Sequence, residues 1–359
     1  MLMNKRFLYL LFFFFSLPSF SFEGLDSLVN IAIQSKTLPG GVVLIGHRDQ
    51  FIYLKNYVSP KETIYDLASL TKVITATSIL ILEEERKLKL SDKLSKYYSE
   101  FNTQEKKEIS IEDLLRHNSG LPAVVRAHAG EKYPDFIHKT LSLPLEYRPG
   151  EKTVYSDVGY IILGDLIQKI SNLSLEEFTR LKIFEPLAMN QTGFKVKDAD
   201  KHLCAPTGNS QLCLPHDPKA YYLYPHQLGH AGVFSTILDF SKMAQLFLNK
   251  GIYQNKRILK EVSVRKMSVI HGDEIRGTGF DLLSPYASAP RGDIFPAGIS
   301  YGHTGFTGTT MWIDPKSEHY YLFFSNRVFL GQDKTGKPFT ELRRSMAHLI
   351  GKKIYDGLK

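Results

Sequence analysis

The chain has 359 residues, of which 43% are hydrophobic, 12% aromatic and 23% charged. This length suits about two domains, or one large domain with an insertion, and it can bury a core without disulfide staples. The apolar content excludes a disordered chain, and the single long apolar run, at the N-terminus, excludes a polytopic membrane protein.

The net charge of +8, from 45 basic and 37 acidic residues, raises the question of a polyanionic partner. Two of the positive charges, Lys5 and Arg6, belong to an N-terminal segment that we expect to be removed. The other lysines are scattered rather than clustered with aromatic residues, so we predict a solvated basic face and no nucleic-acid partner. A polyanion-binding envelope protein is the alternative, and salt-sensitive retention on heparin would reveal it.

The N-terminal segment has the three parts of a secretory signal peptide. Residues 1–6 are basic, residues 7–15 are apolar, and Ser19 and Ser21 are small residues at the expected cleavage site. We therefore predict a signal peptide over residues 1–21 and a mature protein that is periplasmic or secreted. The apolar core is short for a bilayer of about 30 Å, and an uncleaved segment that holds the protein at the membrane is the alternative.

Export would place Cys204 and Cys213, the two cysteines of the chain, in an oxidising compartment. We predict a local disulfide that pins a loop, with two free thiols as the alternative. Neither cysteine has partners at the spacing of a zinc site, so the pair predicts no bound zinc.

The first predicted elements are a helix, a hairpin and a second helix. Residues 23–35 form the first helix, which ends before Leu38-Pro39-Gly40-Gly41. Residues 42–46 and 51–56 flank a polar turn, which is the pattern of a β-hairpin. A long helical pattern then covers residues 69–87.

The rest of the chain continues with helices and returns to strands. Further helices are expected over residues 111–116, 159–170, 175–184, 231–249 and 339–349, and further strands over residues 301–313 and 320–326. Strands at both ends of the chain predict an α/β (α+β) fold with one central antiparallel sheet flanked by helices. We expect the sheet part over about residues 22–66 and 225–359, and an inserted, mostly helical part over about residues 67–224.

Ser69 and Lys72 form a Ser-x-x-Lys motif at the start of the helix predicted over residues 69–87. Residues three apart share one face of a helix, so the ammonium can reach the hydroxyl. The helix N-terminus favours an alkoxide, and a desolvated lysine can lose its proton and act as a base. Taken alone the motif is weak, because Ser263 and Lys266 repeat it, and a solvated helix surface explains either motif by itself.

Two further segments could complete a site with Ser69. Tyr155 follows a loop, and its phenol could act as a general base if a neighbouring ammonium favours the phenolate. A partly buried structural tyrosine is the alternative. Residues 301–309 (YGHTGFTGT) place three glycines in a predicted strand, which indicates the close approach of a ligand or of another backbone, or else a bulged edge strand.

Together, these motifs resemble the serine penicillin-recognising superfamily of class C β-lactamases, DD-peptidases and related esterases. Residues 111–122 (IEDLLRHNSGLP) are similar to its DLL-x-H-x-SGLP segment, and residues 183–189 (IFEPLAM) to its PLGM segment. Residues 229–236 (GHAGVFST) resemble the GHAGLFST segment of a periplasmic subgroup that includes the penicillin-binding protein 4B type, and His216-Asp217 suits that subgroup. The similarity extends in order over about residues 38–330.

The resemblance implies a β-lactamase/transpeptidase-like fold and an acyl-enzyme mechanism without a cofactor. By position, Ser69 is the nucleophile, Lys72 its basic partner and Tyr155 the base that activates water in the second step. The N–H groups of Ser69 and Phe306 would form the oxyanion hole. The residues expected to contact the substrate are Asp157, His303, Thr304, Gly305, Asn326 and Arg327. The guanidinium of Arg327 could bind a substrate carboxylate.

Two positions depart from the family pattern. The family's Tyr-x-Asn is Tyr155-Ser156-Asp157 here, and an aspartate beside Lys72 could keep the lysine protonated and shift the role of base toward Tyr155. The family's Lys-Thr-Gly is His303-Thr304-Gly305, and a histidine that is mostly neutral near pH 7 is a poorer carboxylate clamp. Both changes argue against an efficient β-lactamase and suit a peptidase or an esterase.

Three histidines, His216, His226 and His230, raise a metal site as an alternative, because two of them are four residues apart. Leu228-Gly229 lies between those two and indicates a loop rather than a helix. We therefore predict no metal site and expect His230 to support the wall of the active site by hydrogen bonding.

These observations predict an exported serine hydrolase that forms an acyl-enzyme on amide or ester substrates. The first expectation is a DD-carboxypeptidase-like enzyme acting on cell-wall peptides. A carboxylesterase or weak β-lactamase of the same superfamily, and a non-catalytic penicillin-binding or sensor module, remain as alternatives. The expected partner is a small molecule or a peptidoglycan-derived peptide, and the sequence does not indicate the oligomeric state.

Overall fold

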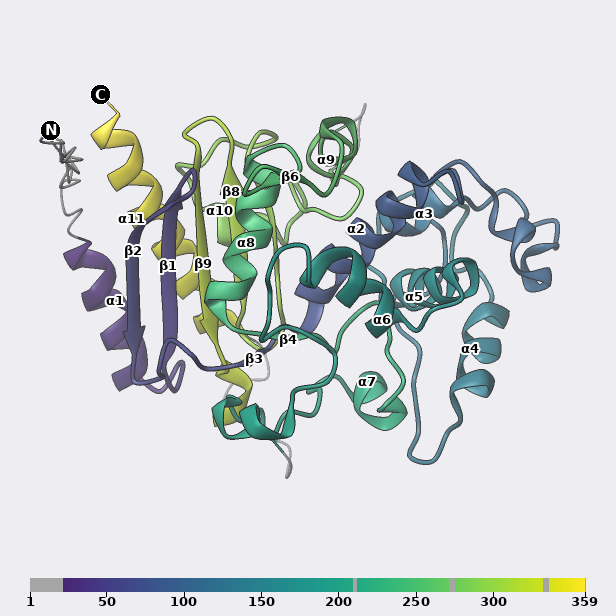
Figure 1. The fold of residues 1–359 in the computed structure, drawn as a ribbon, viewed down its shortest axis with the longest axis horizontal. Helices are drawn as coiled ribbons and strands as arrows, with labels where there is room; N and C mark the ends of the chain where they lie inside the picture. The colour runs from purple at the N-terminus through teal and green to yellow at the C-terminus, as the bar shows by residue number, and fades with distance from the viewer. Residues whose placement is uncertain (1–21, 209–211, 271–274, 332–335, 359) are drawn as a thin grey trace, which may run out of the picture.

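The structure is a computed structural model that describes residues 22–208, 212–270, 275–331 and 336–358. The signal peptide predicted over residues 1–21 lies outside the described residues. A five-stranded antiparallel sheet occupies one side of the molecule, and a group of helices occupies the other (Figure 1). Over the described ranges, no helix combines the length and the apolarity that a bilayer crossing needs.

The sheet joins the two ends of the chain, as the sequence predicts. Its strand order is β2-β1-β9-β8-β7, and every neighbouring pair is antiparallel. The strands span Gly41–His47 (β1), Gln50–Tyr57 (β2), Tyr301–Thr304 (β7), Thr310–Asp314 (β8) and His319–Ser325 (β9). The predicted hairpin of residues 42–46 and 51–56 is confirmed by β1 and β2, and β1 also pairs with β9, with Val43 opposite Phe323.

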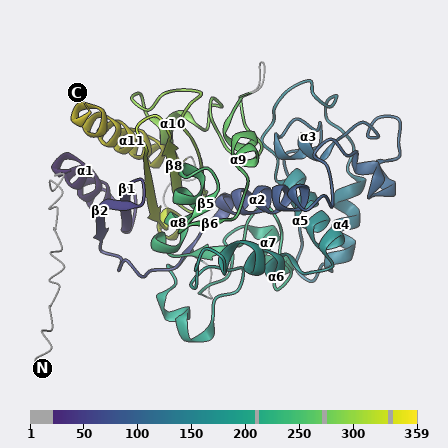
Figure 2. The ribbon, with the colours of Figure 1, turned by 45° about the horizontal axis from the view of Figure 1, so that its top comes forward.

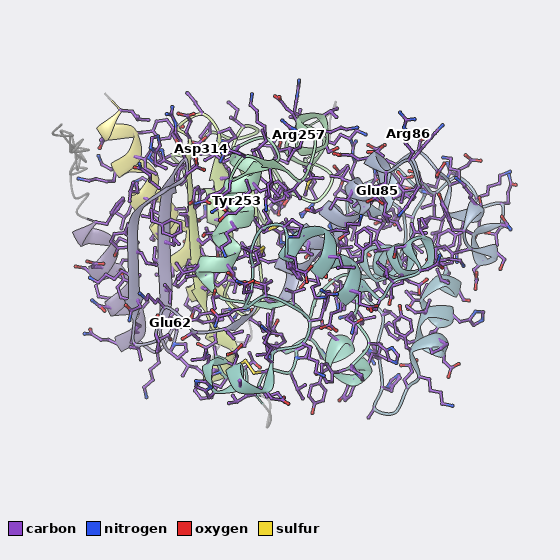
Figure 3. All side chains as sticks on the ribbon, viewed as in Figure 1. Glu62, Glu85, Arg86, Tyr253, Arg257 and Asp314 are labelled. Carbon is purple, nitrogen blue, oxygen red and sulfur yellow. A yellow bond between two sulfur atoms is a disulfide. The ribbon has the colours of Figure 1, made fainter. Side chains whose placement is uncertain are left out.

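Both faces of the sheet are covered, because side chains alternate along the central strands. Val42 and Leu44 of β1 pack in the cluster that contains α2 (Thr71–Glu84) and α8 (Ile237–Leu248). Val43 and Ile45 pack in a second cluster with α1 (Glu23–Gln34) and α11 (Lys337–Gly357). Asp314, labelled at the end of the sheet in Figure 3, accepts a hydrogen bond from Tyr355 of α11 (2.8 Å).

The helical part packs around α2, which runs from the sheet into it alongside α5 (Figure 2). Its helices span Ile111–Leu115 (α3), Tyr133–Ser142 (α4), Asp157–Ser171 (α5), Leu175–Thr179 (α6) and Pro218–Leu223 (α7). The smaller elements are β3 (Tyr65–Asp66), β4 (Phe234–Ser235), β5 (Ile252–Tyr253), β6 (Lys256–Arg257), α9 (Glu261–Ser268) and α10 (Ser288–Arg291).

Two glycines let the loop before β4 approach α5. A Cβ on Gly164 would lie 2.6 Å from the backbone nitrogen of Gly229, and a Cβ on Gly229 would lie 2.3 Å from the carbonyl oxygen of Tyr160. Contacts this short do not occur between real side chains and backbone, so any larger residue would push the loop away. The close approach places His230 against α2 and α5.

Three predicted elements are wrong in their bounds. The helix expected over residues 339–349 runs over Lys337–Gly357 as α11. The strand expected over residues 301–313 is a hairpin of β7 and β8, because residues 305–309 turn, with Gly308 at φ +125°. The helix expected over residues 231–249 begins at Ile237, because β4 pairs with β3 before it and Thr236 caps the helix by accepting from Asp239 N–H (3.2 Å).

Candidate active site

Ser69 lies in the short 3-10 turn Ala68–Leu70 that leads directly into α2. Lys72, one turn later, is fully buried, and its Nζ lies 3.2 Å from Ser69 Oγ. Ala68 has a φ of +45°, which is uncommon for a residue with a Cβ, and its N–H donates to Asp66 Oδ1 (2.8 Å). The backbone just before Ser69 is therefore held in a strained conformation by β3.

The second Ser-x-x-Lys motif has a different environment on α9. Ser263 Oγ donates to Glu84 (2.6 Å), and Lys266 Nζ pairs with both carboxylate oxygens of Glu83 (2.9 and 2.8 Å). Both residues of this motif bind glutamates at the end of α2, and the two do not form a pair with each other. The ammonium–hydroxyl pair is found in the first motif and not in the second.

The ammonium of Lys72 is held by three acceptors. It donates to Ser69 Oγ, to Asp157 Oδ1 (2.8 Å) and to the carbonyl oxygen of His230 (3.1 Å). Burial by itself would lower the pKa of Lys72, but the charges and hydrogen bonds of Asp157 and Tyr155 outweigh it and raise the pKa. The expectation that the aspartate keeps this lysine protonated agrees with the geometry.

Asp157 belongs to a larger group of buried charges. Its Oδ2 lies 3.2 Å from Lys219 Nζ, which also pairs with Asp217 Oδ2 (2.9 Å), and Asp217 Oδ1 lies 2.9 Å from His230 Nε2. Burial would raise the pKa of both carboxyl groups, but the neighbouring positive charges hold each pKa well below its usual range.

This group includes a geometrically possible metal site, two of whose three residues are paired with an ammonium. One ligand atom each from Asp157, Asp217 and His230 lies within 4.8 Å of the others. Lys219 Nζ contacts both carboxylates and supplies the positive charge there. The histidine cluster considered from the sequence does not converge, since His216 stacks on Phe306 (5.8 Å between centroids) and His226 stacks on Tyr133 (4.9 Å).

Tyr155 closes the other side of Lys72. Its ring centroid lies 4.8 Å from Lys72 Nζ, 4.6 Å from the ring of His117 and 5.2 Å from the guanidinium carbon of Arg276. Buried His117 accepts a hydrogen bond from Ser156 N–H at Nδ1 (2.9 Å), and burial lowers its pKa well below the usual value. A neutral imidazole thus fixes the backbone that carries Tyr155.

His303 lies on β7, the edge strand next to this group. Its Nδ1 lies 2.9 Å from the carbonyl oxygen of Thr304, and among the described residues its buried Nε2 has no hydrogen-bond partner. Burial, and then the charges of Arg276 and Lys72, lower its pKa well below 6.5. His303 is therefore neutral near pH 7 and carries no charge with which to hold a carboxylate.

The turn after β7 is fixed against the backbone that carries Ser69. Thr307 Oγ1 donates to Asp66 O (2.6 Å) and Thr309 Oγ1 donates to Leu67 O (3.1 Å). A Cβ on Gly305 would lie 2.3 Å from Leu67 O, so glycine is required for this close approach. The peptide group that joins Gly305 to Phe306 therefore lies beside the segment that leads to Ser69.

Two arginines hold the carbonyl groups of that turn. Arg343 of α11 donates through Nη2 to Gly305 O and to Thr309 O (2.8 Å each), and Arg327 Nε donates to Phe306 O (2.9 Å). A trans peptide points its C=O and N–H in opposite directions. Arg343 therefore binds the carbonyl side of the Gly305–Phe306 peptide, whose N–H points the other way.

Asn326 is placed differently from the expected substrate contact. It is 5% exposed, and its amide donates to Pro206 O (2.7 Å). Pro206 follows Cys204, which is bonded to Cys213 in the structure. The amide of Asn326 therefore fastens the disulfide-closed loop to the end of β9, and we do not include it among the groups that bind substrate.

The family model described as "Beta-lactamase" matches residues 25–342. The chain belongs to the β-lactamase family. It is 30% identical over 340 residues to a protein of Escherichia coli O157:H7 named "Putative D-alanyl-D-alanine carboxypeptidase", covering 80% of this chain and 78% of that protein. Its family membership makes it a hydrolase of the serine β-lactamase and penicillin-binding protein superfamily.

Two solved structures of this superfamily share the fold. A penicillin-binding protein homologue from Caulobacter crescentus has a TM-score of 0.70 at 15% identity, covering 91% of this chain and 96% of that one. A penicillin-binding protein homologue from Pyrococcus abyssi has a TM-score of 0.70 at 22% identity, covering 91% and 77%. These structures confirm the predicted fold class, and the family model with the relative from Escherichia coli confirms the resemblance to the superfamily.

The structure brings together most of the residues singled out in the sequence and adds others. Ser69, Lys72, Tyr155 and Asp157 form one contact group, and His303 lies next to Tyr155, with ring centroids 6.0 Å apart. The residues that sequence reasoning missed are Lys219, Arg276, Arg343 and, as a support for Tyr155, His117. Of these, His117 alone had a signal, since it lies in the family-like segment of residues 111–122.

Proposed function

We propose that this hydrolase works through an acyl-enzyme on Ser69. The observation that supports the proposal most strongly is the contact of fully buried Lys72 with Ser69 Oγ, 3.2 Å away, while Asp157 and Tyr155 lie on the same ammonium. A serine needs a neighbouring base to become a nucleophile, and this group supplies candidate bases within reach.

In the first step, Ser69 Oγ attacks the substrate carbonyl carbon and passes its proton to the Lys72–Tyr155 pair. The N–H groups of Ser69 and Phe306 stabilise the negative charge that develops on the carbonyl oxygen. The tetrahedral intermediate collapses, the amine or alcohol leaves with that proton, and the acyl group stays on Ser69. Water then gives a proton to the same pair and attacks the ester carbonyl carbon, the acyl group leaves as a carboxylic acid, and Ser69 Oγ takes the proton back.

The hydrogen bonds of Lys72 support Tyr155 as the group that takes the proton. All three ammonium hydrogens of Lys72 have an acceptor, and one of these acceptors is Ser69 Oγ itself. A protonated lysine that donates to the hydroxyl oxygen stabilises the alkoxide but does not accept its proton. We propose that Tyr155, in its phenolate form beside the same ammonium, takes the proton and serves as base in both steps.

We propose a DD-carboxypeptidase-like activity on cell-wall peptides as the reaction, in an exported protein. The relatives that carry the carboxypeptidase name, at about 30% identity over most of this chain, support this substrate class. Arg327, whose guanidinium lies 4.6 Å from the ring centroid of Phe306, is the candidate for contacting a terminal carboxylate. Asp157, Thr304 and Gly305 remain proposed substrate contacts.

A carboxylesterase is the second candidate, and buried His303 favours it. In place of the cationic lysine of β-lactamases, the chain has an imidazole whose pKa is lowered by burial and by neighbouring cations. An ester substrate needs no partner for a carboxylate at that position. The same feature predicts weak binding of penicillins.

The test compares the wild type with Ser69→Ala, and uses Ser263→Ala, from the second motif, as the matched control. D-alanine release is measured from a peptide that ends in D-Ala-D-Ala, and nitrophenol release from a short-chain nitrophenyl ester. We expect Ser69→Ala to lose turnover of whichever substrate the wild type uses, and Ser263→Ala to keep it. Equal turnover by Ser69→Ala and wild type would overturn the acyl-enzyme proposal, and ester turnover without D-alanine release would assign the esterase.

A further inference from the structure

Five residues form a closed ring of polar contacts behind Ser69. Lys72 Nζ contacts Asp157 Oδ1 (2.8 Å), Asp157 Oδ2 contacts Lys219 Nζ (3.2 Å), and Lys219 Nζ contacts Asp217 Oδ2 (2.9 Å). Asp217 Oδ1 contacts His230 Nε2 (2.9 Å), and the His230 carbonyl accepts from Lys72 (3.1 Å). The ring joins α2, α5, α7 and the loop before β4.

Lys219 is the member of the ring that links the two carboxylates. Its side chain is 10% exposed, and those of Asp157 and Asp217 are 17% and 20% exposed. Each oxygen of Asp157 thus has a different cation, Lys72 on one side and Lys219 on the other. Without Lys219, two poorly solvated carboxylates would face each other across the space that its ammonium fills.

We propose that Lys219 is a positioning residue for proton transfer at Ser69. By sharing the Asp157 carboxylate with Lys72, it orients that carboxylate and limits how strongly Asp157 holds the proton on Lys72. The inference rests on the proposed acyl-enzyme function and assigns a role to a residue that does not itself touch the serine.

Loss of the Lys219 charge should raise the proton affinity of the Lys72–Tyr155 pair, whether Lys72 or Tyr155 takes the proton. Removing a positive charge close to Lys72 and Tyr155 makes the pair bind its proton more tightly, because less repulsion opposes the added proton. The surrounding groups already act on this pair from several elements. The titratable and charged groups that face Lys72 or Lys219 are Asp157, Asp217, His230, Tyr155, Tyr160, His117, His303 and Arg276.

The aspartate also explains why a second lysine belongs here. Where the family pattern has a neutral asparagine, this chain has Asp157, which adds a negative charge beside the lysine of the nucleophile. The positive charge of Lys219 offsets that negative charge, so the net local charge is the same as with a neutral asparagine and no second lysine. Changing Lys219 should therefore have a much smaller effect in an Asp157→Asn background than in the wild type.

The experiment measures the rate at which a fluorophosphonate probe labels the full chain between pH 5 and pH 10. The variants are Lys219→Met, Lys219→Arg, Asp157→Asn and the double variant Asp157→Asn/Lys219→Met, which is compared with Asp157→Asn. Lys106→Met is the matched control, because Lys106 is also buried, 6% exposed, but donates to Leu141 O (3.0 Å) away from the ring. Thermal melting of each variant shows whether it is folded.

We expect Lys219→Met to shift the acidic limb of the labelling profile upward by about one pH unit, so that labelling at a pH on that limb becomes about tenfold slower. Lys219→Arg should return to within about threefold of the wild type, and Lys106→Met should keep the wild-type profile. In the Asp157→Asn background, Lys219→Met should slow labelling by less than about threefold. A Lys219→Met profile that superimposes on that of the wild type, or a Lys219→Met effect as large in the Asp157→Asn background as in the wild type, would overturn the proposal. A wild type that is not labelled at Ser69 contradicts the proposed function instead.

Discussion

The two halves of the candidate site differ in the kind of group that they contribute. On the helical side, Lys72, Asp157, Lys219 and Asp217 are charged side chains that neutralise one another in a poorly solvated space. On the sheet side, the groups are a neutral imidazole, His303, next to Tyr155, and the backbone of the turn after β7, which is fixed against the segment that leads to Ser69. The cations of the sheet side, by contrast, bind carbonyl oxygens of that backbone.

On this comparison, the charged helical side transfers protons, and the backbone of the sheet side stabilises the charge that develops on the substrate. A proton is transferred between groups of adjustable pKa, and charged neighbours adjust it. An oxyanion is stabilised by N–H groups that are already oriented, because they need no reorganisation during the reaction. On this account, substitutions on the helical side change pH profiles, whereas substitutions on the sheet side lower the rate without moving the profile.

The largest effect is expected for Lys72→Met, on the helical side. The substitution removes the ammonium that contacts Ser69 and leaves Asp157 with Lys219 as its remaining cation, so labelling by a fluorophosphonate should fall about 10³-fold. The comparison is made at equal folded fraction, measured by circular dichroism. Labelling within about tenfold of the wild type would remove the lysine from the mechanism.

A smaller effect is expected for Arg343→Met, on the sheet side. Loss of the guanidinium removes one donor each from Gly305 O and Thr309 O, which keep the backbone donors Gly308 N–H (3.2 Å) and Gly305 N–H (2.8 Å). The Phe306 N–H should then be less well oriented, and kcat should fall about 10- to 100-fold with little change in KM. The position of the pH profile should stay that of the wild type.

Arg344→Met is the control for Arg343. Arg344 is the next residue on α11, and its side chain, 38% exposed, lies 3.5 Å from Glu341 at the surface. We expect its rate to match the wild type. Equal losses in the two variants would show that the helix, and not the bound turn, is what matters.

The disulfide should contribute stability more than rate. A loop closed by Cys204 and Cys213, nine residues apart, restricts the unfolded chain by about 2–3 kcal/mol. Cys204→Ser/Cys213→Ser should lose about this much free energy of unfolding in urea titration and keep turnover within about threefold. A collapse of turnover with unchanged stability would show that the loop shapes the site directly, through Asn326 and Pro206.

The smallest effect on rate is expected for His303→Gln, because neutral glutamine replaces an imidazole that is already neutral. The pKa of His303 is lowered in the folded protein, so its unfolded state binds the proton first as the pH falls below about 6.5. The wild type should therefore lose stability below that pH, and the variant should lose less. Thermal melting between pH 5 and pH 8 measures the difference, and identical profiles would contradict the buried neutral histidine.

Local patterns were enough to predict the serine motif and the antiparallel sheet from the two chain ends. The hairpin of β1 and β2 has a polar turn between two strand-forming segments, and Ser69 and Lys72 are neighbours on one helix turn. The three glycines in residues 301–309 indicate a real close approach, but residues 305–309 form a turn where the sequence predicts a strand.

The residues that sequence reasoning missed contact the site through the topology of the fold. Lys219 meets Asp157 because α7 packs near the start of α5, and Arg343 meets Gly305 because α11 covers the sheet. Nothing in their own segments distinguishes them from the other basic residues, and Arg343 has an arginine beside it. Only the fold separates the surface arginine from the one that binds the turn.

Mass spectrometry of the intact protein tests the central claim most directly. The chain is mixed with a peptide ending in D-Ala-D-Ala, with a short-chain ester and with a fluorophosphonate, and is then digested to locate any added mass. We predict an adduct on the peptide that contains Ser69 in the wild type and in Ser263→Ala, and none in Ser69→Ala. An adduct on another residue, or one that persists in Ser69→Ala, would contradict the account.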